Sequence, residues 1–265
     1  MAARSYLFAP GERPERFQKA YDAGADAVIL DLEDGVALAN KVQARSEVVA
    51  WLSPERPVYV RINGPETQWF EDDLKAVGRR PGVRGIVLPK AESAEQLARV
   101  ATQTPGHVTL LPLIETAQGL WRVADIARAP RVERLAFGSY DFQFDTGIQG
   151  DGEELLYACS RLVIVSRVAG ILPPVDSVTT DLDDPKKLTA DVDRARRLGF
   201  GAKLCIHPNQ IAAVNAGFVP SNAEKAWAKE VLAAVAAAGK GAIRFQGRMI
   251  DRPIIERAKR ILEHK

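Results

Sequence analysis

Short apolar runs alternate with helix-like segments along most of the chain. The apolar runs recur roughly every 20 to 35 residues, at 6–9, 27–32, 58–62, 85–88, 109–114, 135–137, 170–172 and 202–206. Between them, apolar positions follow helical spacing over 14–23, 43–52, 94–100, 117–127, 155–168 and 187–198. Alternating strands and helices predict a parallel sheet with right-handed crossovers, and eight repeats predict closure into a (β/α)8 TIM barrel.

Residues at the ends of the expected helices agree with this pattern. Pro14 suits the first turn of a helix, and Ser93 can cap a helix together with Gln96 three residues later. Gly199 follows a basic helical stretch and can end it. These signals predict where several of the crossover helices begin and end.

The chain continues beyond the eighth expected strand. An alanine-rich amphipathic segment covers 221–238, and a last helical segment covers 253–262. We therefore expect a (β/α)8 barrel with a metal site over 1–220 and a C-terminal helical extension over 221–265. Such an arm can pack on a neighbouring subunit or cover its own barrel, and the pattern alone is compatible with both.

Composition excludes several classes of protein. The 265 residues are 46% hydrophobic and carry a formal net charge of +2, so neither a nucleic-acid binder nor a membrane-surface binder is expected. Cys159 and Cys205 lie far apart, which argues against a disulfide framework or a zinc site. No apolar run approaches about 18 residues. We expect a cytoplasmic protein.

Two apolar runs stop at a carboxylate on consecutive expected strands. The fifth run ends at Glu115, and the sixth is followed by Asp141. Because parallel barrels gather their functional groups at the carboxyl ends of the strands, these side chains should lie together. Two hard oxygen ligands suit Mg²⁺, which keeps water or substrate oxygens in its other positions, and Mn²⁺ could take the same place. The alternative is a structural pair, but two unpaired carboxylates would repel each other.

The second and third strands bring further charged residues to the same rim. Asp31, Glu33 and Asp34 follow the second strand, where they can hold metal-bound waters, and Arg61 ends the third. Its planar guanidinium can bind a substrate carboxylate or an oxyanion. It can equally form a salt bridge to the Asp31 cluster, and both roles can coexist.

Other candidates for catalysis are few. Arg13 and Lys19 lie near the first helix start, where they can meet phosphate groups or form a solvated basic face. Among the three histidines, His207 stands at a strand-to-helix junction and suits a structural or a supporting role equally. No Ser-His-Asp or Cys-His arrangement is visible. A mechanism based on carboxylates, arginine and metal is expected.

Several motifs together resemble the citrate lyase β-subunit family, which includes malyl-CoA and citramalyl-CoA lyases. They are Arg4-Ser-Tyr-Leu-Phe-Ala-Pro-Gly11, Asp31-Leu-Glu-Asp-Gly-Val36, Arg61-Ile-Asn63, Leu113-Ile-Glu-Thr116, Phe137-Gly-Ser-Tyr-Asp141 and Ile206-His-Pro-Asn-Gln210. The resemblance implies a barrel that assembles as a homotrimer or a multiple of it. It also implies Mg²⁺ on the residues that match Glu115 and Asp141.

The same resemblance implies roles for individual residues. Arg61 would contact the substrate's carboxylate or carbonyl, Gly138 and Ser139 would offer it backbone amides, and Asp251 would transfer a proton in a neighbouring subunit's site. The expected catalytic residues are Arg61, Glu33 and Asp251; the expected substrate-binding residues are Arg61, Gly138, Ser139, Asp31 and Asp34; and Arg4, Arg13 and Lys19 are the expected contacts of coenzyme A.

The implied activity is cleavage of a 3-hydroxyacyl-CoA thioester to acetyl-CoA and a 2-oxo acid, with these small molecules as partners. Three alternatives stay open from sequence alone. A thioester hydrolase could use the same groups, and a non-catalytic regulatory homologue could keep the fold. A metal-dependent 2-oxo-acid aldolase is disfavoured, because its relatives depend on a histidine near the second-strand loop and residues 31–40 contain none.

Overall fold

The computed structural model describes residues 2–238 and 243–263, which form two compact units. The larger unit covers 2–215 and the smaller lies within 216–265. The sequence predicted a division after residue 220. The boundary falls instead inside a helix, α10 (Ile211–Gly217), between Asn215 and Ala216.

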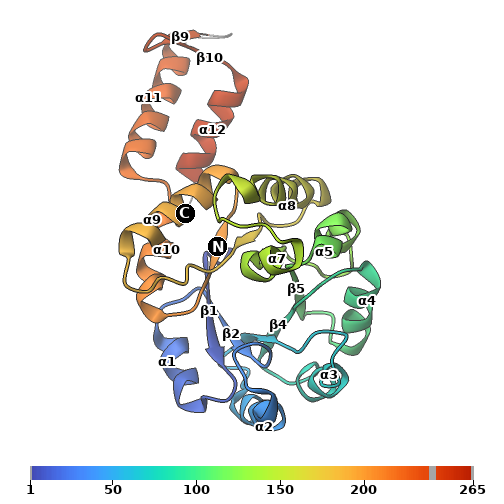
Figure 1. Cartoon of the computed structure of the whole chain (residues 1–265). Coiled ribbons are helices and arrows are strands. Elements are labelled where there is room, and N and C mark those ends of the chain that lie inside the picture. The colour runs from blue at the N-terminus through green and yellow to red at the C-terminus, as the bar shows by residue number, and fades with distance from the viewer. Residues whose placement is uncertain (1, 239–242, 264–265) are drawn as a thin grey trace. The chain divides into compact units, whose positions relative to one another are not determined.

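Eight parallel strands of the larger unit form a closed barrel in the order of the sequence, which confirms the predicted TIM-barrel fold (Figure 1). The strands are β1 (Ser5–Pro10), β2 (Ala27–Asp31), β3 (Val58–Arg61), β4 (Val83–Leu88), β5 (Thr109–Ile114), β6 (Ala136–Phe137), β7 (Val175–Asp176) and β8 (Ala202–Cys205). Pairing of β1 with β8 closes the sheet.

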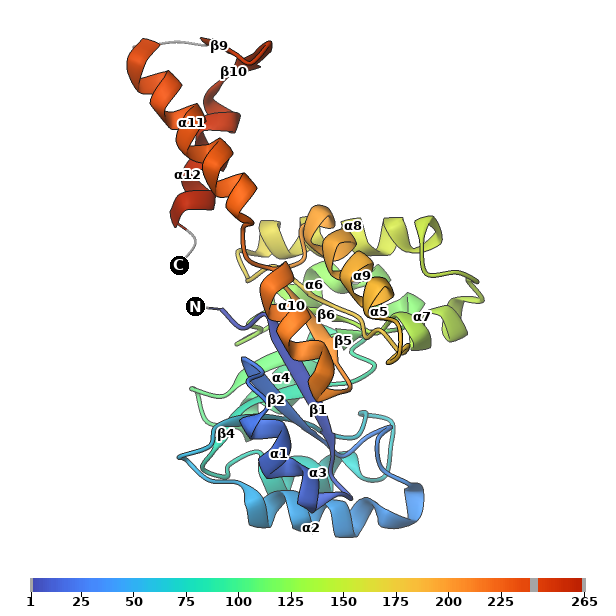
Figure 2. The same cartoon turned by 90° about the vertical axis from the view of Figure 1, so that its left-hand side faces the viewer.

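Helices of the larger unit surround this barrel, as Figures 1 and 2 show. Besides α10, they are α1 (Phe17–Asp22), α2 (Lys41–Trp51), α3 (Phe70–Val77), α4 (Ala94–Gln103), α5 (Ala117–Trp121), α6 (Val123–Ala127), α7 (Ser139–Thr146), α8 (Leu156–Ala169) and α9 (Pro185–Leu198). Short 3-10 turns are η1 (Pro14–Arg16), η2 (Leu38–Asn40), η3 (Glu153–Leu155) and η4 (Pro208–Gln210). The helical spacing read from the sequence therefore predicted most of the crossovers.

The predicted helix ends are confirmed at three places. Pro14 begins η1. Ser93 and Gln96 form a complete capping box at the start of α4, in which each side chain binds the other residue's backbone N–H. Gly199 ends α9 in the left-handed conformation, φ 103°, and its N–H reaches the last carbonyls of the helix.

The seventh strand was predicted at 170–172, and this prediction is wrong. Gly170 ends α8 with φ 73°, and the N–H of Ile171 still binds Ser166 of that helix. The N–H of Leu172 binds the carbonyl of Glu133, and the barrel strand begins only at Val175. A short apolar run after a helix can be the segment that ends the helix and leads away from it, instead of a strand. Periodicity alone cannot distinguish these two possibilities.

Alternate residues of successive strands fill the barrel interior. Tyr6 and Tyr59 meet edge to face with ring centroids 5.5 Å apart. Ile29 and Val87 belong to the same buried cluster. Helices cover the outer face of the sheet, so β2 consists of five buried residues and reads as a continuous apolar run rather than an alternating one.

The smaller unit is built on two packed helices, α11 (Asn222–Ala238) and α12 (Arg252–Glu263), which confirms the two helices expected there. A hairpin that the sequence did not predict, β9 (Ile243–Phe245) and β10 (Arg248–Ile250), precedes α12. Ala228, Val231 and Ile261 belong to its own buried cluster. Within residues 2–238 and 243–263, no helix combines the length and apolar character needed to span a bilayer.

Candidate active site

Asp31, Glu33 and Arg61 form a buried ionic cluster at the carboxyl ends of β2 and β3. Asp31 and Arg61 are register partners at the ends of these strands. Nε and Nη2 of Arg61 lie 2.6 Å from the two carboxylate oxygens of Asp31, and Nη1 lies 2.9 Å from Glu33 Oε2. Asp34 is more exposed, with Oδ2 at 3.9 Å from Nη1. The salt bridge that the sequence suggested for Arg61 is present.

Burial and charge act in opposite directions on these carboxyl groups. Burial opposes ionisation of Asp31, but the Arg61 guanidinium and the backbone N–H groups of Glu33 and Gly35 outweigh it and lower the pKa. For Glu33, burial prevails over the attraction of Arg61 and Lys90 and raises the pKa. Glu33 is therefore the member of this cluster that takes up a proton more readily.

A buried lysine holds the loop that follows β2. Lys41 is 5% exposed, and its ammonium donates to the backbone carbonyls of Leu32 and Glu33 at 2.9 and 2.8 Å. Gly35 leaves no room for a Cβ, which would lie 2.5 Å from Asp31 Oδ2. The loop is thus fixed by its own backbone, and the carboxylates it carries have defined positions.

Glu115 follows β5 and is 1% exposed. Its Oε1 accepts a 2.7 Å hydrogen bond from the backbone N–H of Lys90. On its other side lies Gly138, where a Cβ would come within 2.5 Å of Oε2. Burial, reinforced by the neighbouring charges of Glu33 and Asp141, raises the pKa of Glu115 to about 8 despite the attraction of Lys90 and Arg61.

Asp141 was expected at the end of the sixth strand, but it lies in the first turn of α7, after β6 has ended at Phe137. Its side chain is 42% exposed. Lys90 Nζ lies 3.7 Å from Asp141 Oδ1, 3.9 Å from Glu115 Oε1 and 3.0 Å from Glu33 Oε1. The carboxylates of Glu115 and Asp141 therefore both face the Lys90 ammonium.

These two carboxylates fit a hard divalent cation. An oxygen of each lies within 4 Å of the same ammonium nitrogen, so two oxygen-donor side chains converge on one positively charged group. No group of three or more His, Cys, Asp or Glu side chains in 2–238 and 243–263 is arranged to hold a metal alone. Two protein ligands with water or substrate in the other positions is the arrangement typical of Mg²⁺, and not of a structural zinc site.

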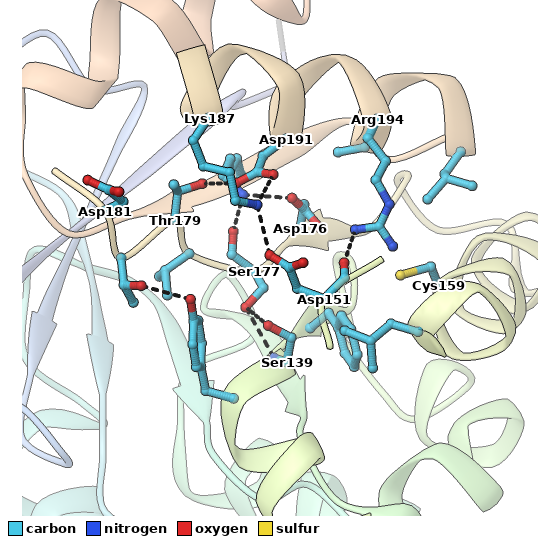
Figure 3. Close-up of a pocket in the computed structure, with 18 residues that line it drawn as sticks. Ser139, Asp151, Cys159, Asp176, Ser177, Thr179, Asp181, Lys187, Asp191 and Arg194 are labelled. Carbon is cyan, nitrogen blue, oxygen red and sulfur yellow. Dashed lines mark hydrogen bonds and ion pairs between the residues drawn. The ribbon is translucent and has the colours of Figure 1, made fainter. Parts of the chain in front are cut away.

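The backbone amides of Gly138 and Ser139 were expected to bind substrate, but both have partners within the protein. The N–H of Gly138 donates to the carbonyl of Ile114 at 3.0 Å. The N–H of Ser139 donates to Ser177 Oγ at 3.1 Å, and the two serine hydroxyls lie 2.7 Å apart. Figure 3 marks both contacts by dashed lines. In this arrangement neither amide is available to a substrate oxygen.

Ser177 belongs to a cavity of about 70 Å³ between the end of β7 and helices α8 and α9 (Figure 3). Buried Lys203 supports it there by donating to the Ser177 carbonyl and to Asp176 Oδ2 at 2.6 and 2.7 Å. The sequence analysis did not select Lys41, Lys90 or Ser177 as site residues. Lys90 offered one signal, its place after the fourth strand, while Ser177 offered none.

The expected contacts of coenzyme A lie at two ends of the barrel. Arg13 and Lys19 are exposed, with Arg13 in the loop after β1 at the same end as Glu115. Arg4 precedes β1 and pairs with Asp26, which precedes β2, with Nε 2.8 Å from Oδ2. Arg4 therefore lies at the amino ends of the strands, the opposite end from Glu115. This position does not agree with its expected role as a contact of coenzyme A.

Asp251 belongs to the smaller unit, where it is exposed between β10 and α12. Its Oδ1 accepts from the N–H of Ile254 at 3.4 Å, and its carbonyl accepts from Ile255 at 3.1 Å. The side chain thus caps the start of α12 only weakly. Its carboxylate keeps capacity for a further partner.

Comparison with known proteins agrees with the barrel fold and identifies the family. The family model for HpcH/HpaI aldolase/citrate lyase matches residues 4–208. A citrate lyase subunit beta-like protein from Deinococcus radiodurans is 36% identical over 278 residues, which cover 99% of this chain and 97% of that protein. Two relatives from Cereibacter sphaeroides, an L-malyl-CoA/beta-methylmalyl-CoA lyase and a (3S)-malyl-CoA thioesterase, are each 33% identical and cover 98% of this chain and 93% of their own lengths.

A similar solved structure contains bound groups of its own. The crystal structure of CitE from Mycobacterium tuberculosis, in complex with magnesium, acetoacetate and coenzyme A, has a TM-score of 0.88 and 36% identity. The alignment covers 99% of this chain and 97% of that one. Since the family model spans well over half of the sequence and several relatives match nearly all of it, the chain belongs to the HpcH/HpaI aldolase/citrate lyase family.

Proposed function

We propose that this protein is a magnesium-dependent carbon-carbon lyase that cleaves a 3-hydroxyacyl-CoA thioester to acetyl-CoA and a 2-oxo acid. The observation that carries the proposal is the convergence of Glu115 and Asp141 beside the Arg61 cluster at one rim of the barrel. The related CitE structure with magnesium, acetoacetate and coenzyme A supports this chemistry. Malyl-, citramalyl- and citryl-CoA are the substrates to compare.

Glu115 and Asp141 would hold the metal, and Mn²⁺ could replace Mg²⁺. When bound, the metal supplies a Lewis acid that polarises the oxygens of the 2-oxo-acid part of the substrate. The neighbouring Glu33, Asp31 and Asp34 would orient water and substrate oxygens at this edge.

Arg61 would bind the departing 2-oxo acid. The carboxylates of Asp31 and Glu33 accept hydrogen bonds from three of its N–H groups. A guanidinium has five such donors, so two stay available to a carboxylate or a developing oxyanion. The paired arrangement with Asp31 holds the guanidinium plane in one orientation, which favours recognition of a planar anionic group.

The proton transfers require a base and an acid. Glu33 is our candidate for the base that removes the hydroxyl proton, because burial raises its pKa and Lys90 and Arg61 orient its carboxylate. As the carbon-carbon bond breaks, its electrons pass into the thioester carbonyl and form an enolate. Asp251 of a neighbouring subunit would return a proton to carbon and yield acetyl-CoA. This step requires an oligomer, for which we propose a homotrimer or a multiple of it.

The acyl carrier would be free coenzyme A. Arg13 and Lys19 are exposed near the loop after β1, where they can meet phosphate groups without competing with buried partners. Arg13 already pairs with Glu15 at the surface, Nε to Oε1 3.1 Å, and both side chains are more than half exposed. Such a pair contributes little and can exchange for a phosphate.

A thioesterase on the same substrates is the second candidate. The (3S)-malyl-CoA thioesterase from Cereibacter sphaeroides is as similar to this chain as the malyl-CoA lyase is. Both reactions need the thioester group and the same anion-binding residues. They differ only in whether the carbon-carbon bond or the thioester bond breaks.

The test is product analysis of purified protein with malyl-, citramalyl- and citryl-CoA and Mg²⁺, read by mass spectrometry. A lyase yields acetyl-CoA and a 2-oxo acid, whereas a thioesterase yields free coenzyme A and the hydroxy acid. EDTA, Glu115→Ala and Asp141→Ala should each abolish turnover, and Asp183→Asn on an exposed loop should not. Full activity of Glu115→Ala in EDTA would exclude the proposed metal site.

A further inference from the structure

The ammonium of Lys90 occupies the centre of the carboxylate group described above. Its Nζ lies within 4 Å of Glu33, Glu115 and Asp141, and the side chain is 44% exposed. Glu33 is the closest, at 3.0 Å, and the other two are slightly farther than a hydrogen bond. The lysine therefore makes one hydrogen bond, to the proposed base Glu33. It interacts with the two proposed metal ligands, Glu115 and Asp141, through charge alone.

The backbone of Lys90 also contacts Glu115. Its φ is 48°, a left-handed value that a residue with a Cβ adopts rarely. In this conformation the N–H donates to Glu115 Oε1 at 2.7 Å while the ammonium approaches the same oxygen from outside. One residue thus positions Glu115 and supplies a positive charge to it.

The distribution of charge shows what the ammonium balances. Arg61 lies against Asp31 and Glu33, whose two negative charges already exceed its single positive charge. In the described part of the chain, Lys90 is the cation with an ion pair to Glu115 or Asp141. Without it, two carboxylates, one of them buried, would face each other with no ion-paired cation among the described residues.

We propose that Lys90 is a built-in counter-ion of the metal site, which holds Glu33, Glu115 and Asp141 together when no metal is bound and weakens metal binding when one arrives. The inference rests on the proposed metal site at Glu115 and Asp141. A divalent ion on these oxygens would sit close to the ammonium, and the two positive charges repel each other. With the lysine in place, the metal is not needed to keep the rim assembled.

The experiment measures Mn²⁺ affinity by calorimetry and by electron paramagnetic resonance, with the full-length protein and no substrate. Lys90→Met keeps the backbone N–H to Glu115 and removes the charge, so Mn²⁺ should bind about tenfold tighter or more. Lys90→Gln should change the affinity in the same direction. Lys90→Arg, which keeps the charge, should stay within about threefold of the wild type.

A matched control tests whether removing a lysine charge elsewhere in the protein would also raise the Mn²⁺ affinity. Lys187 is 40% exposed and also bridges two carboxylates, with Nζ 2.8 Å from Asp151 and 2.6 Å from Asp191. These carboxylates are not the proposed metal ligands. Lys187→Met should therefore leave Mn²⁺ affinity unchanged within about twofold, since exposed charges at a distance are screened.

Thermal unfolding gives a second readout. In EDTA, Lys90→Met should melt below the wild type, because Glu115 and Asp141 lose their ion-paired cation, and saturating Mn²⁺ should remove most of that difference. Unchanged or weaker Mn²⁺ binding in both Lys90→Met and Lys90→Gln would overturn the inference while leaving the metal site intact. If the wild type itself bound no Mn²⁺, the proposed metal site and the inference would both fail.

Discussion

Arg61 and Asp31 meet edge to edge, with Nε and Nη2 of the guanidinium each 2.6 Å from one carboxylate oxygen. The guanidinium also lies over the ring of Phe8, 4.7 Å from its centroid. Two parallel hydrogen bonds and a stacked face fix both the position and the plane of the cation. A lysine at this position could supply the charge but not the geometry.

The first prediction follows from that geometry. Arg61→Lys should lower kcat/KM by about 10² or more, because an ammonium cannot bind Asp31 through two parallel bonds and face the substrate at once. Steady-state kinetics with saturating Mg²⁺ measures the effect, and circular dichroism monitors the fold. Arg99→Lys, at an exposed pair with Glu71, is the matched control and should be neutral. Wild-type kinetics for Arg61→Lys would leave Arg61 with a structural role only.

The second prediction concerns the space beside Glu115. Gly138→Ala adds a Cβ that would lie 2.5 Å from Oε2 and 2.8 Å from Cβ of Glu115, so this carboxylate must move. We expect Mn²⁺ affinity to fall about tenfold or more, with turnover falling in parallel. Gly106→Ala, where an added Cβ meets nothing within 4 Å, should behave as the wild type. Undiminished Mn²⁺ affinity in Gly138→Ala would show that Glu115 does not bind the metal.

The third prediction tests whether Asp251 acts in a neighbouring subunit. Glu115→Ala and Asp251→Ala should each be nearly inactive when pure. When they are mixed and reassembled one to one in a cyclic oligomer, about a quarter of the sites would combine an intact Glu115 with an intact Asp251 from the next subunit. Activity should return to about that fraction, and native mass spectrometry should show that mixed oligomers have formed.

Two results would contradict this shared site. If mixed oligomers form and no activity returns, the two residues do not complete each other's sites. If Asp251→Ala alone is fully active, the smaller unit contributes packing and not a proton. Melting temperature should change little in Asp251→Ala, since the side chain makes only one long hydrogen bond, 3.4 Å, to the start of α12.

The fourth prediction concerns the two cysteines, which are free and buried. Burial raises the pKa of Cys159 to about 11 and that of Cys205 to about 12. Thiols of an unfolded chain titrate near about 8.5, so the folded state keeps its thiol protons to higher pH than the unfolded state does. The thiols' contribution to the free energy of unfolding should be complete below about pH 8 and decline as the pH rises through 9 and 10.

Urea unfolding of the wild type and of the double variant Cys159→Ala, Cys205→Ala measures this difference. The stability of the wild type should decline more steeply with pH than that of the double variant, because only the wild type carries thiols that ionise on unfolding. At pH 8, a thiol reagent should modify neither cysteine in the native protein and both in urea. Rapid modification of the native protein would show that at least one thiol is accessible.

The order of apolar runs and helical segments was sufficient to predict the barrel. Parallel strands buried on both faces need continuous apolar stretches such as β2, and amphipathic crossover helices need apolar residues at helical spacing. Both patterns can therefore be recognised from the residue types along the sequence. The same reasoning gathered Asp31, Arg61 and Glu115 at one rim, since parallel strands all end at the same edge. The seventh strand was misplaced because the apolar run at 170–172 is the exit from α8, and the two-residue strand β7 that follows is too short to show a period of its own.

Only the tertiary structure decided how the charges at that rim pair. The sequence shows that Lys90 follows a strand, but not that its left-handed backbone brings one nitrogen to Glu115 and the other near Asp141. The sequence likewise could not show that Ser177 accepts a hydrogen bond from the backbone N–H of Ser139, since residues 38 positions apart meet only through the fold. Residue type and spacing determine which elements form, whereas the direction of each side chain depends on neighbours that folding brings together.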